Sequence, residues 1–194
     1  ALALGSVALA TQNAQALSPL AIVNGITASG GVGVSKNILY GDEPDQDLDI
    51  YYPKPLAQAM KAQSAINDGA INDSYPMVVF VHGGSWESGN KEQYAFVGQS
   101  LAQAGYVTAG INYRKAPEHV YPDYVKDTAQ AIAWSINNAS SLHADPKRLA
   151  VIGHSAGAFN AVAAVANEDF LAPYGIKPKD IKAGVGIAGP YSYD

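Results

Sequence analysis

The sequence contains no cysteine and carries little charge. Its 194 residues include no Cys, and Asp, Glu, Lys and Arg together make up 15% of the chain. The absence of thiols excludes disulfides, catalytic thiolates and thiolate-bound zinc, although it indicates no redox compartment. With 12 basic residues against 17 acidic ones, a net charge of −5 and no basic cluster, the composition argues against a nucleic-acid partner.

No stable membrane span is expected either. The uncharged apolar segment 1–10 is too short to cross a bilayer, and polar residues separate it from the small-x-small triplet 14–16. We interpret residues 1–16 as a signal-peptide remnant with cleavage after Ala16, and we therefore expect a periplasmic or secreted protein. An initiator methionine and a basic leader are absent, and a frayed amphipathic helix is the alternative interpretation.

What is present is typical of one globular domain. A hydrophobic content of 48% over this length is enough for a sizeable core. Residues 17–33 show no clear period and predict an irregular N-terminal arm, and 54–75 is interpreted as a surface insertion without an assigned function. Expected strands cover 34–40, 47–52, 77–81, 106–111, 149–152 and 183–188; expected helices cover 56–65, 93–104, 123–138 and the residues after 155.

Acidic residues gather around the second expected strand. Polar and apolar residues alternate over 47–52, which predicts a strand with one wet face. A calcium loop starting at Asp45 would need Gly at its sixth position and Glu at its twelfth, where this chain has Ile50 and Leu56. We therefore predict a solvated strand edge. The acidic set is Asp42, Glu43, Asp45, Asp47 and Asp49.

The segment 149–158 carries the strongest functional signal. A short apolar run leads into Gly153-His154-Ser155-Ala156-Gly157 and then into an alanine-rich helical pattern. This is Gly-x-Ser-x-Gly in a strand, turn and helix setting, where a strained turn exposes the serine hydroxyl as a nucleophile. Glycines flank the serine because side chains there would crowd the packing of strand against helix, and the N-terminal amides of the helix favour developing negative charge. A plain glycine turn at a helix start is the alternative.

A second motif follows the strand expected over 77–81. That strand opens into His82-Gly83-Gly84-Ser85-Trp86, a sequence similar to the oxyanion loop of lipases and esterases. Two glycines let the backbone turn N–H groups toward a site above the strand ends. A glycine-rich turn before a helix is the alternative, and we expect Trp86 to pack beside an acyl pocket.

A third motif extends the resemblance. Residues 113–119, Tyr-Arg-Lys-Ala-Pro-Glu-His, with Tyr121-Pro122 and Asp127 beyond, resemble the corresponding stretch of hormone-sensitive-lipase-like esterases. The three motifs stand in family order, so the chain from about residue 34 to 194 resembles the α/β-hydrolase esterases and lipases, including feruloyl/acetylxylan-esterase-like and kynurenine-formamidase-like branches. The resemblance implies an α/β-hydrolase fold, mostly parallel sheet flanked by helices, and hydrolysis of a small-molecule carboxylic ester without cofactor or metal.

The resemblance also implies roles for individual residues. Ser155 would be the nucleophile, and the backbone N–H groups of Ala156, Gly84 and Ser85 would hold the oxyanion. Arg114 and Glu118 would brace loops. Ser85 departs from the third glycine of many members, but its backbone N–H is retained.

The triad partners of the serine are not found. In this fold an Asp or Glu and then a His follow the serine, whereas His82, His119, His143 and His154 all precede Ser155. His119 is the one conceivable stand-in, and Asp194 lies too early for the triad acid. We therefore interpret residues 34–194 as a partial domain, inactive as it stands, whose last strand leaves an apolar edge.

Three alternatives stay open at this point. The missing base allows a non-catalytic binding protein of the same fold, and an arylformamidase-like amidase would use the same residues. Residues 184–189 also match Gly-x-Gly-x-x-Gly, a dinucleotide-binding pattern, but they lie within an expected strand and no helix follows. The sequence indicates neither acyl specificity nor oligomeric state.

Overall fold

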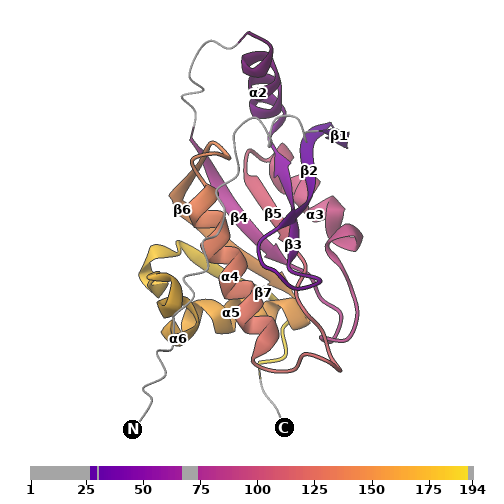
Figure 1. Ribbon diagram of the computed structural model, residues 1–194, viewed down its shortest axis with the longest axis vertical. Helices are drawn as coiled ribbons and strands as arrows, with labels where there is room; N and C mark the ends of the chain where they lie inside the picture. Colours follow the sequence, from indigo (N-terminus) through magenta and orange to yellow (C-terminus); the bar gives the residue numbers. More distant parts are fainter. Residues whose placement is uncertain (1–26, 30, 67–73, 192–194) are drawn as a thin grey trace, which may run out of the picture.

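The computed structural model describes residues 27–29, 31–66 and 74–191, and these form one sheet with helices against both faces (Figure 1). The strands are β1 (Thr27–Ser29), β2 (Val32–Leu39), β3 (Asp47–Tyr52), β4 (Tyr75–Val81), β5 (Val107–Ile111), β6 (Ala144–His154) and β7 (Ala183–Ile187). The helices are α2 (Lys54–Ile66), α3 (Ala95–Gln103), α4 (Asp123–Asn138), α5 (Ala156–Ala166) and α6 (Glu168–Leu171), with short 3₁₀ turns η1 (Lys91–Tyr94), η2 (Ala172–Tyr174) and η3 (Pro178–Asp180).

The sheet is mixed, with order β1-β2-β3-β5-β4-β6-β7 in the described chain. The pairings among β1, β2, β3 and β5 are antiparallel, whereas β5, β4, β6 and β7 pair in parallel. Since parallel strands end at the same edge, the segments that follow β4 and β6 come together there. Both sequence motifs lie in these segments.

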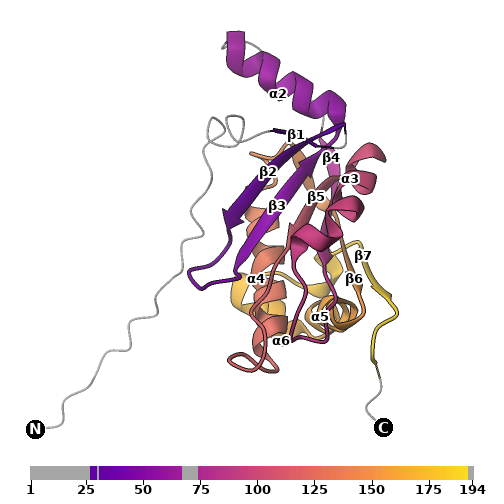
Figure 2. The ribbon, with the colours of Figure 1, turned by 90° about the vertical axis from the view of Figure 1, so that its right-hand side faces the viewer.

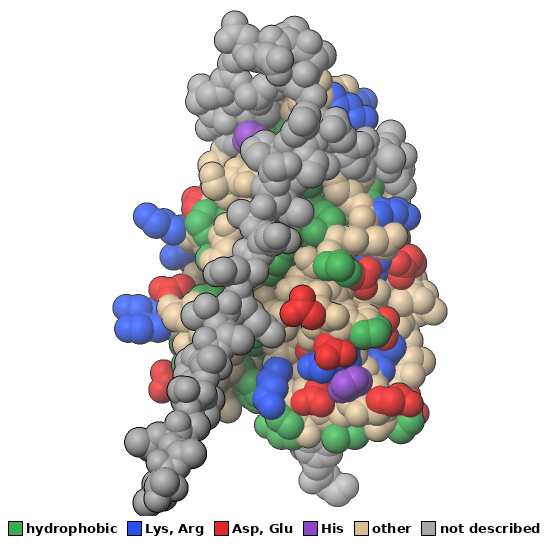
Figure 3. All heavy atoms as spheres, viewed as in Figure 1, with side chains coloured by type: hydrophobic (Ala, Val, Ile, Leu, Met, Phe, Trp, Pro, Cys, Tyr) green, Lys and Arg blue, Asp and Glu red, His purple; other side chains and the backbone are tan. Residues whose placement is uncertain are grey.

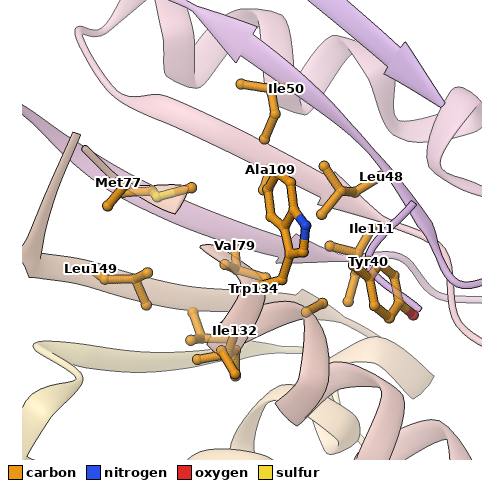
Figure 4. Packing of buried hydrophobic residues seen from close by; sticks show 14 of the residues in the cluster. Tyr40, Leu48, Ile50, Met77, Val79, Ala109, Ile111, Ile132, Trp134 and Leu149 are labelled. Atoms are coloured by element: carbon orange, nitrogen blue, oxygen red, sulfur yellow. The ribbon is translucent and has the colours of Figure 1, made fainter. Parts of the chain in front are cut away.

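Helix α4 supplies much of the core. Val125, Ala129 and Ile132 are buried along it. The side chain of Trp134 points from α4 toward Leu48, Ile111 and Val79 of the sheet (Figure 4). Helix α5 packs beside α4 on the same face of the sheet, so polar residues of α4 are buried as well.

Helix α3 covers the opposite face (Figure 2). It packs against β5, β3 and β2, where Tyr51 and Ala102 belong to a second, smaller apolar cluster. The close approach requires a glycine, because a Cβ at Gly98 would lie 2.4 Å from the ring of Tyr51. The covered face explains why the predicted wet face of β3 is wrong: Asp49 and Tyr51 are buried, and β3 lies between β2 and β5 rather than at an edge.

Other boundaries also differ from expectation. The irregular arm expected over 17–33 contains β1 and the start of β2, since these residues pair antiparallel in the sheet; residues 17–26 and 30 lie outside the described ones. The insertion 54–75 contains α2, whose thirteen residues extend the helix expected at 56–65. Strand β6 begins at Ala144, five residues before the apolar run that predicted it.

Strand β7 forms an edge of the described sheet. It pairs with β6 alone, and its Val185 and Ile187 side chains are 41% and 49% exposed. The glycine pattern 184–189 lies within and just after this strand, as expected from the sequence, and Pro190-Tyr191 continues without a helix.

The signal-peptide hypothesis concerns residues 1–16, which lie outside the described residues. In the part of the chain that the structure describes, no helix is long and apolar enough to cross a membrane.

Candidate active site

Ser155 occupies a sharp turn between β6 and α5. Its backbone adopts φ 53° and ψ −122°, a conformation that residues with side chains rarely populate. The Ser155 N–H donates to the carbonyl of Ile187 at 2.8 Å, so β7 holds the turn from the side. The residue is half-buried, and within the described chain its hydroxyl makes no hydrogen bond. The strand, turn and helix setting predicted from the sequence is confirmed.

The two flanking glycines are required by backbone contacts. A Cβ at Gly153 would lie 2.1 Å from the carbonyl oxygen of Gly157. A Cβ at Gly157 would lie 2.2 Å and 2.3 Å from the carbonyl oxygens of His82 and Val81. Because backbone atoms cannot move aside cheaply, the predicted reason for these glycines is confirmed, and Gly157 additionally fixes the distance between α5 and β4.

The loop after β4 lies directly against the serine turn. A Cβ built on Gly83 would be 3.1 Å from the Cβ of Ser155, so the loop and the turn are in contact. Gly84, Ser85 and Trp86 then adopt φ of 137°, 54° and 60°, which bends the chain back on itself. The Gly84 carbonyl closes this bend by accepting from the N–H groups of Glu87 and Ser88.

The amides proposed from the sequence lie in these two segments. Gly84 is half-buried and Ser85 is exposed at the bend, whereas Ala156 is buried as the first residue of α5. The backbone N–H groups of Gly84 and Ser85 donate no hydrogen bond within the described chain.

Trp86 packs as an anchor for the bend. Its indole N–H donates to Asn160 Oδ1 at 2.8 Å, its ring stacks on Tyr124 at 5.4 Å and it meets Phe159 edge-on at 5.7 Å. Asn160 and Phe159 lie on α5, so the indole ties the loop to the helix that carries Ser155 at its start.

The histidines engage other partners. His154 Nδ1 lies 2.9 Å from the hydroxyl of Tyr94, and His119 Nδ1 lies 3.4 Å from Asp123. His143 precedes β6, at the opposite end of that strand from Ser155. The contact of His119 is a local one, to a residue one turn along the chain.

His82 is buried beneath the loop. Its Nδ1–H donates to the carbonyl of Gly83 at 2.7 Å and its ring stacks on Tyr113 at 4.4 Å. Burial lowers the pKa of His82 to about 4, so its ring is neutral near pH 7. The hydrogen bond and the stacked ring hold the start of the loop in place.

The third motif is fixed by a buried carboxylate. Asp127 Oδ1 accepts from Arg114 Nη2 at 2.8 Å and from Gln46 Nε2 at 2.8 Å, and Oδ2 accepts from the Arg114 backbone N–H at 2.9 Å. The hydrogen bond to Asp127 raises the pKa of Arg114. Arg114 thus braces its loop, as the resemblance implies, whereas Glu118 is exposed and makes no such contact in the described chain.

Sequence reasoning missed Lys91. Its side chain is 1% exposed, and Nζ lies 3.1 Å from Asp47, 3.0 Å from Asp49 and 2.8 Å from Asn37 Oδ1. Hydrogen bonds and ion pairs with these carboxylates and with Glu92 outweigh burial and raise the pKa of Lys91. The signal in the sequence was the pair of aspartates at alternate positions of β3, which points both toward one face.

Comparison with known proteins agrees with this geometry. Isoprenylcysteine alpha-carbonyl methylesterase ICME of Arabidopsis thaliana is 34% identical over 163 residues, covering 82% of this chain and 35% of that protein. Esterase LipC of Mycobacterium tuberculosis is 34% identical over 166 residues, with 82% and 37% coverage. The chain thus spans about a third of the length of these curated relatives.

Solved structures give the same fold. Esterase B from Lactobacillus rhamnosis matches with a TM-score of 0.64 at 20% identity, covering 87% of this chain and 52% of that one, which supports the fold alone. Thermogutta terrifontis esterase 2, phosphonylated by cyclosarin, matches with a TM-score of 0.51 at 26% identity, covering 66% and 45%. The expected α/β-hydrolase fold is confirmed.

The family model BD-FAE matches residues 48–190, a span that includes all three motifs. Since this is well over half of the sequence, the chain belongs to the BD-FAE family of α/β-hydrolase esterases.

Proposed function

We propose that this chain is the nucleophile-bearing part of a serine hydrolase that cleaves carboxylic esters through an acyl-enzyme on Ser155. One observation carries the proposal: Ser155 stands on a strained strand-to-helix turn, in contact with the loop at Gly83. The esterase names of the relatives support the same reaction class, and so does a phosphonylated esterase among the matching structures.

In the proposed reaction Ser155 Oγ attacks the ester carbonyl while its proton passes to a histidine. The carbonyl oxygen becomes an oxyanion, held by the N–H of Ala156 and by those of Gly84 and Ser85. The free Gly84 and Ser85 donors and the helix N-terminus at Ala156 support this assignment. The alcohol leaves with the proton, and water then releases the acid from Ser155.

The general base is assigned to a histidine of the full-length protein outside this sequence. Among the histidines here, His82, His119 and His154 are held by other groups, and the chain covers about a third of its curated relatives. A non-catalytic binding protein and an arylformamidase-like amidase are the alternative functions.

Hydrolysis by the full-length protein tests the proposal. We expect cleavage of p-nitrophenyl acetate and a loss of about 10⁶ in kcat in Ser155→Ala. Ser140→Ala, which changes an exposed serine in the turn before β6, serves as the matched control and should retain activity. Cleavage of an aryl formamide in preference to the ester would favour the amidase alternative, and cleavage of neither would favour the binding protein.

We also propose export, with residues 1–16 as the remnant of a cleaved signal peptide. The uncharged apolar run and the small residues at 14 and 16 support it. Mass spectrometry of the mature protein should find Leu17 as the first residue, and a retained 1–16 segment would contradict export.

A further inference from the structure

Tyr94 connects the serine turn to a different part of the sheet. It is the last residue of η1, and its hydroxyl lies 2.9 Å from Nδ1 of His154, the residue before Ser155. If the hydroxyl donates to Nδ1, the ring proton of His154 lies on Nε2. The Tyr94 ring also packs against Phe80 at 5.5 Å and stacks against His82 at 6.2 Å, so it touches β4 and the start of the loop as well.

His154, which Tyr94 contacts through its hydroxyl, packs against the loop after β4. A Cβ on Gly83 would lie 3.0 Å from the His154 carbonyl oxygen and 3.1 Å from its Nδ1. Backbone and ring of His154 therefore both pack against the loop that carries the proposed oxyanion donors. A rotation of the His154 ring would press on Gly83 and change the gap between this loop and Ser155.

Lys91 fixes the turn from which Tyr94 reaches out. Its backbone N–H donates to Asn112 Oδ1 at 2.8 Å, and its buried ammonium binds Asp47 and Asp49 of β3. Asn112 Nδ2 in turn donates to Asp47 Oδ1 at 2.9 Å. The turn η1 is thereby tied to β3 and to the end of β5, which gives Tyr94 a rigid base on the antiparallel half of the sheet.

We propose that Tyr94 is a positioning residue for acylation of Ser155, acting through His154 to keep the serine turn and the 82–86 loop at their working separation. The inference rests on the proposed ester hydrolysis. Misplacement by a fraction of an ångström at a reacting group is costly to the rate, whereas substrate binding away from that group is unaffected.

The test compares Tyr94→Phe with wild type in the full-length protein. Phe keeps the ring contacts and removes the hydroxyl alone, and Tyr106→Phe, at a tyrosine 37% exposed before β5, is the matched control. Active sites are first counted with a fluorophosphonate so that kcat refers to reactive protein. We expect kcat for p-nitrophenyl acetate to fall roughly tenfold in Tyr94→Phe with KM within about twofold, and Tyr106→Phe to match wild type.

Two further readouts separate positioning from loss of fold. In a double-mutant cycle with His154→Gln, the double variant should lose no more activity than the single His154 variant, because Tyr94 acts through that ring. In long-range ¹H–¹⁵N spectra, the Nδ1 resonance of His154 should shift in Tyr94→Phe and stay unchanged in Tyr106→Phe.

Each outcome decides the inference. If the wild type is active, three results overturn the positioning role of Tyr94 and leave the proposed function standing. These are an unchanged kcat in Tyr94→Phe, additive losses in the cycle, or an unmoved Nδ1 resonance. A full-length wild type without hydrolytic activity overturns the proposed function first and this inference with it.

Discussion

Several residues with unusual backbone angles lie around the candidate site. Ser85, Trp86, Ser155 and Ala188 all have φ between 53° and 60°, although each carries a side chain. Such conformations cost free energy and persist where the surrounding structure enforces them, which is common at reactive sites. Here the enforcing contacts are known: Gly157 against β4, Trp86 against Asn160, and the Ser155 N–H on the Ile187 carbonyl.

Gly157→Ala tests the closest of these contacts. Its Cβ would overlap two backbone carbonyl oxygens at 2.2 and 2.3 Å, so we expect the free energy of unfolding to fall by about 3 kcal/mol, with loss of activity. In Gly184→Ala the new Cβ meets only Val165 at 3.6 Å, and stability should change by less than about 1 kcal/mol. Urea unfolding of both variants provides the comparison, and equal stabilities would contradict the packing described.

The pKa of His82 predicts an acid sensitivity. The folded pKa is about 4, below the value of 6.5 for a free histidine, so the unfolded chain takes up the proton first as pH falls. Stability from this group is complete above pH 6.5 and is lost toward pH 4, a change on the order of 3 kcal/mol. In His82→Gln the decline in unfolding free energy over this range should be smaller by that amount; an identical decline would contradict the buried neutral ring.

At the scale of elements, local sequence patterns predicted helix and strand positions, whereas contacts between residues far apart in the chain were not predicted. The helix 123–138 and the strand over 47–52 have their predicted bounds, and the serine turn lies between strand and helix as expected, because periodicity and glycine spacing are local signals. The wet face of β3 was wrong because its neutralising partner, Lys91, comes from a turn some forty residues further along. Tyr94 and His154 are paired across sixty residues, which no local pattern could indicate.

At this scale, we expect the loss of the Lys91 ammonium to have a large effect on the free energy of unfolding. Lys91→Met leaves the buried carboxylate of Asp49 without its cation, and we expect a loss of about 3–5 kcal/mol in the free energy of unfolding. Lys126→Met, at an exposed position of α4, should change stability by less than about 0.5 kcal/mol. Chemical denaturation near pH 7 measures both, and a mild effect at Lys91 would contradict the description of η1 as anchored by this ion cluster.

At the scale of the whole molecule, the sheet divides into two parts with different tasks. Strands β2 and β3 of the antiparallel part hold the buried ion cluster and, with β5, pack against α3, whereas the parallel strands β4, β6 and β7 end at the candidate site. Charged side chains of both signs are scattered over the described part of the face in Figure 3, with no broad patch of one sign. That surface agrees with the modest net charge of −5.

The most direct measurement is the site of covalent capture. Full-length protein is treated with a fluorophosphonate and digested, and the modified peptide is identified by mass spectrometry. The account predicts one phosphonyl group on Ser155, absent from the Ser155→Ala variant. Hydrolysis of p-nitrophenyl acetate by a protein that carries its label on another residue, or whose Ser155→Ala variant is equally active, would contradict it.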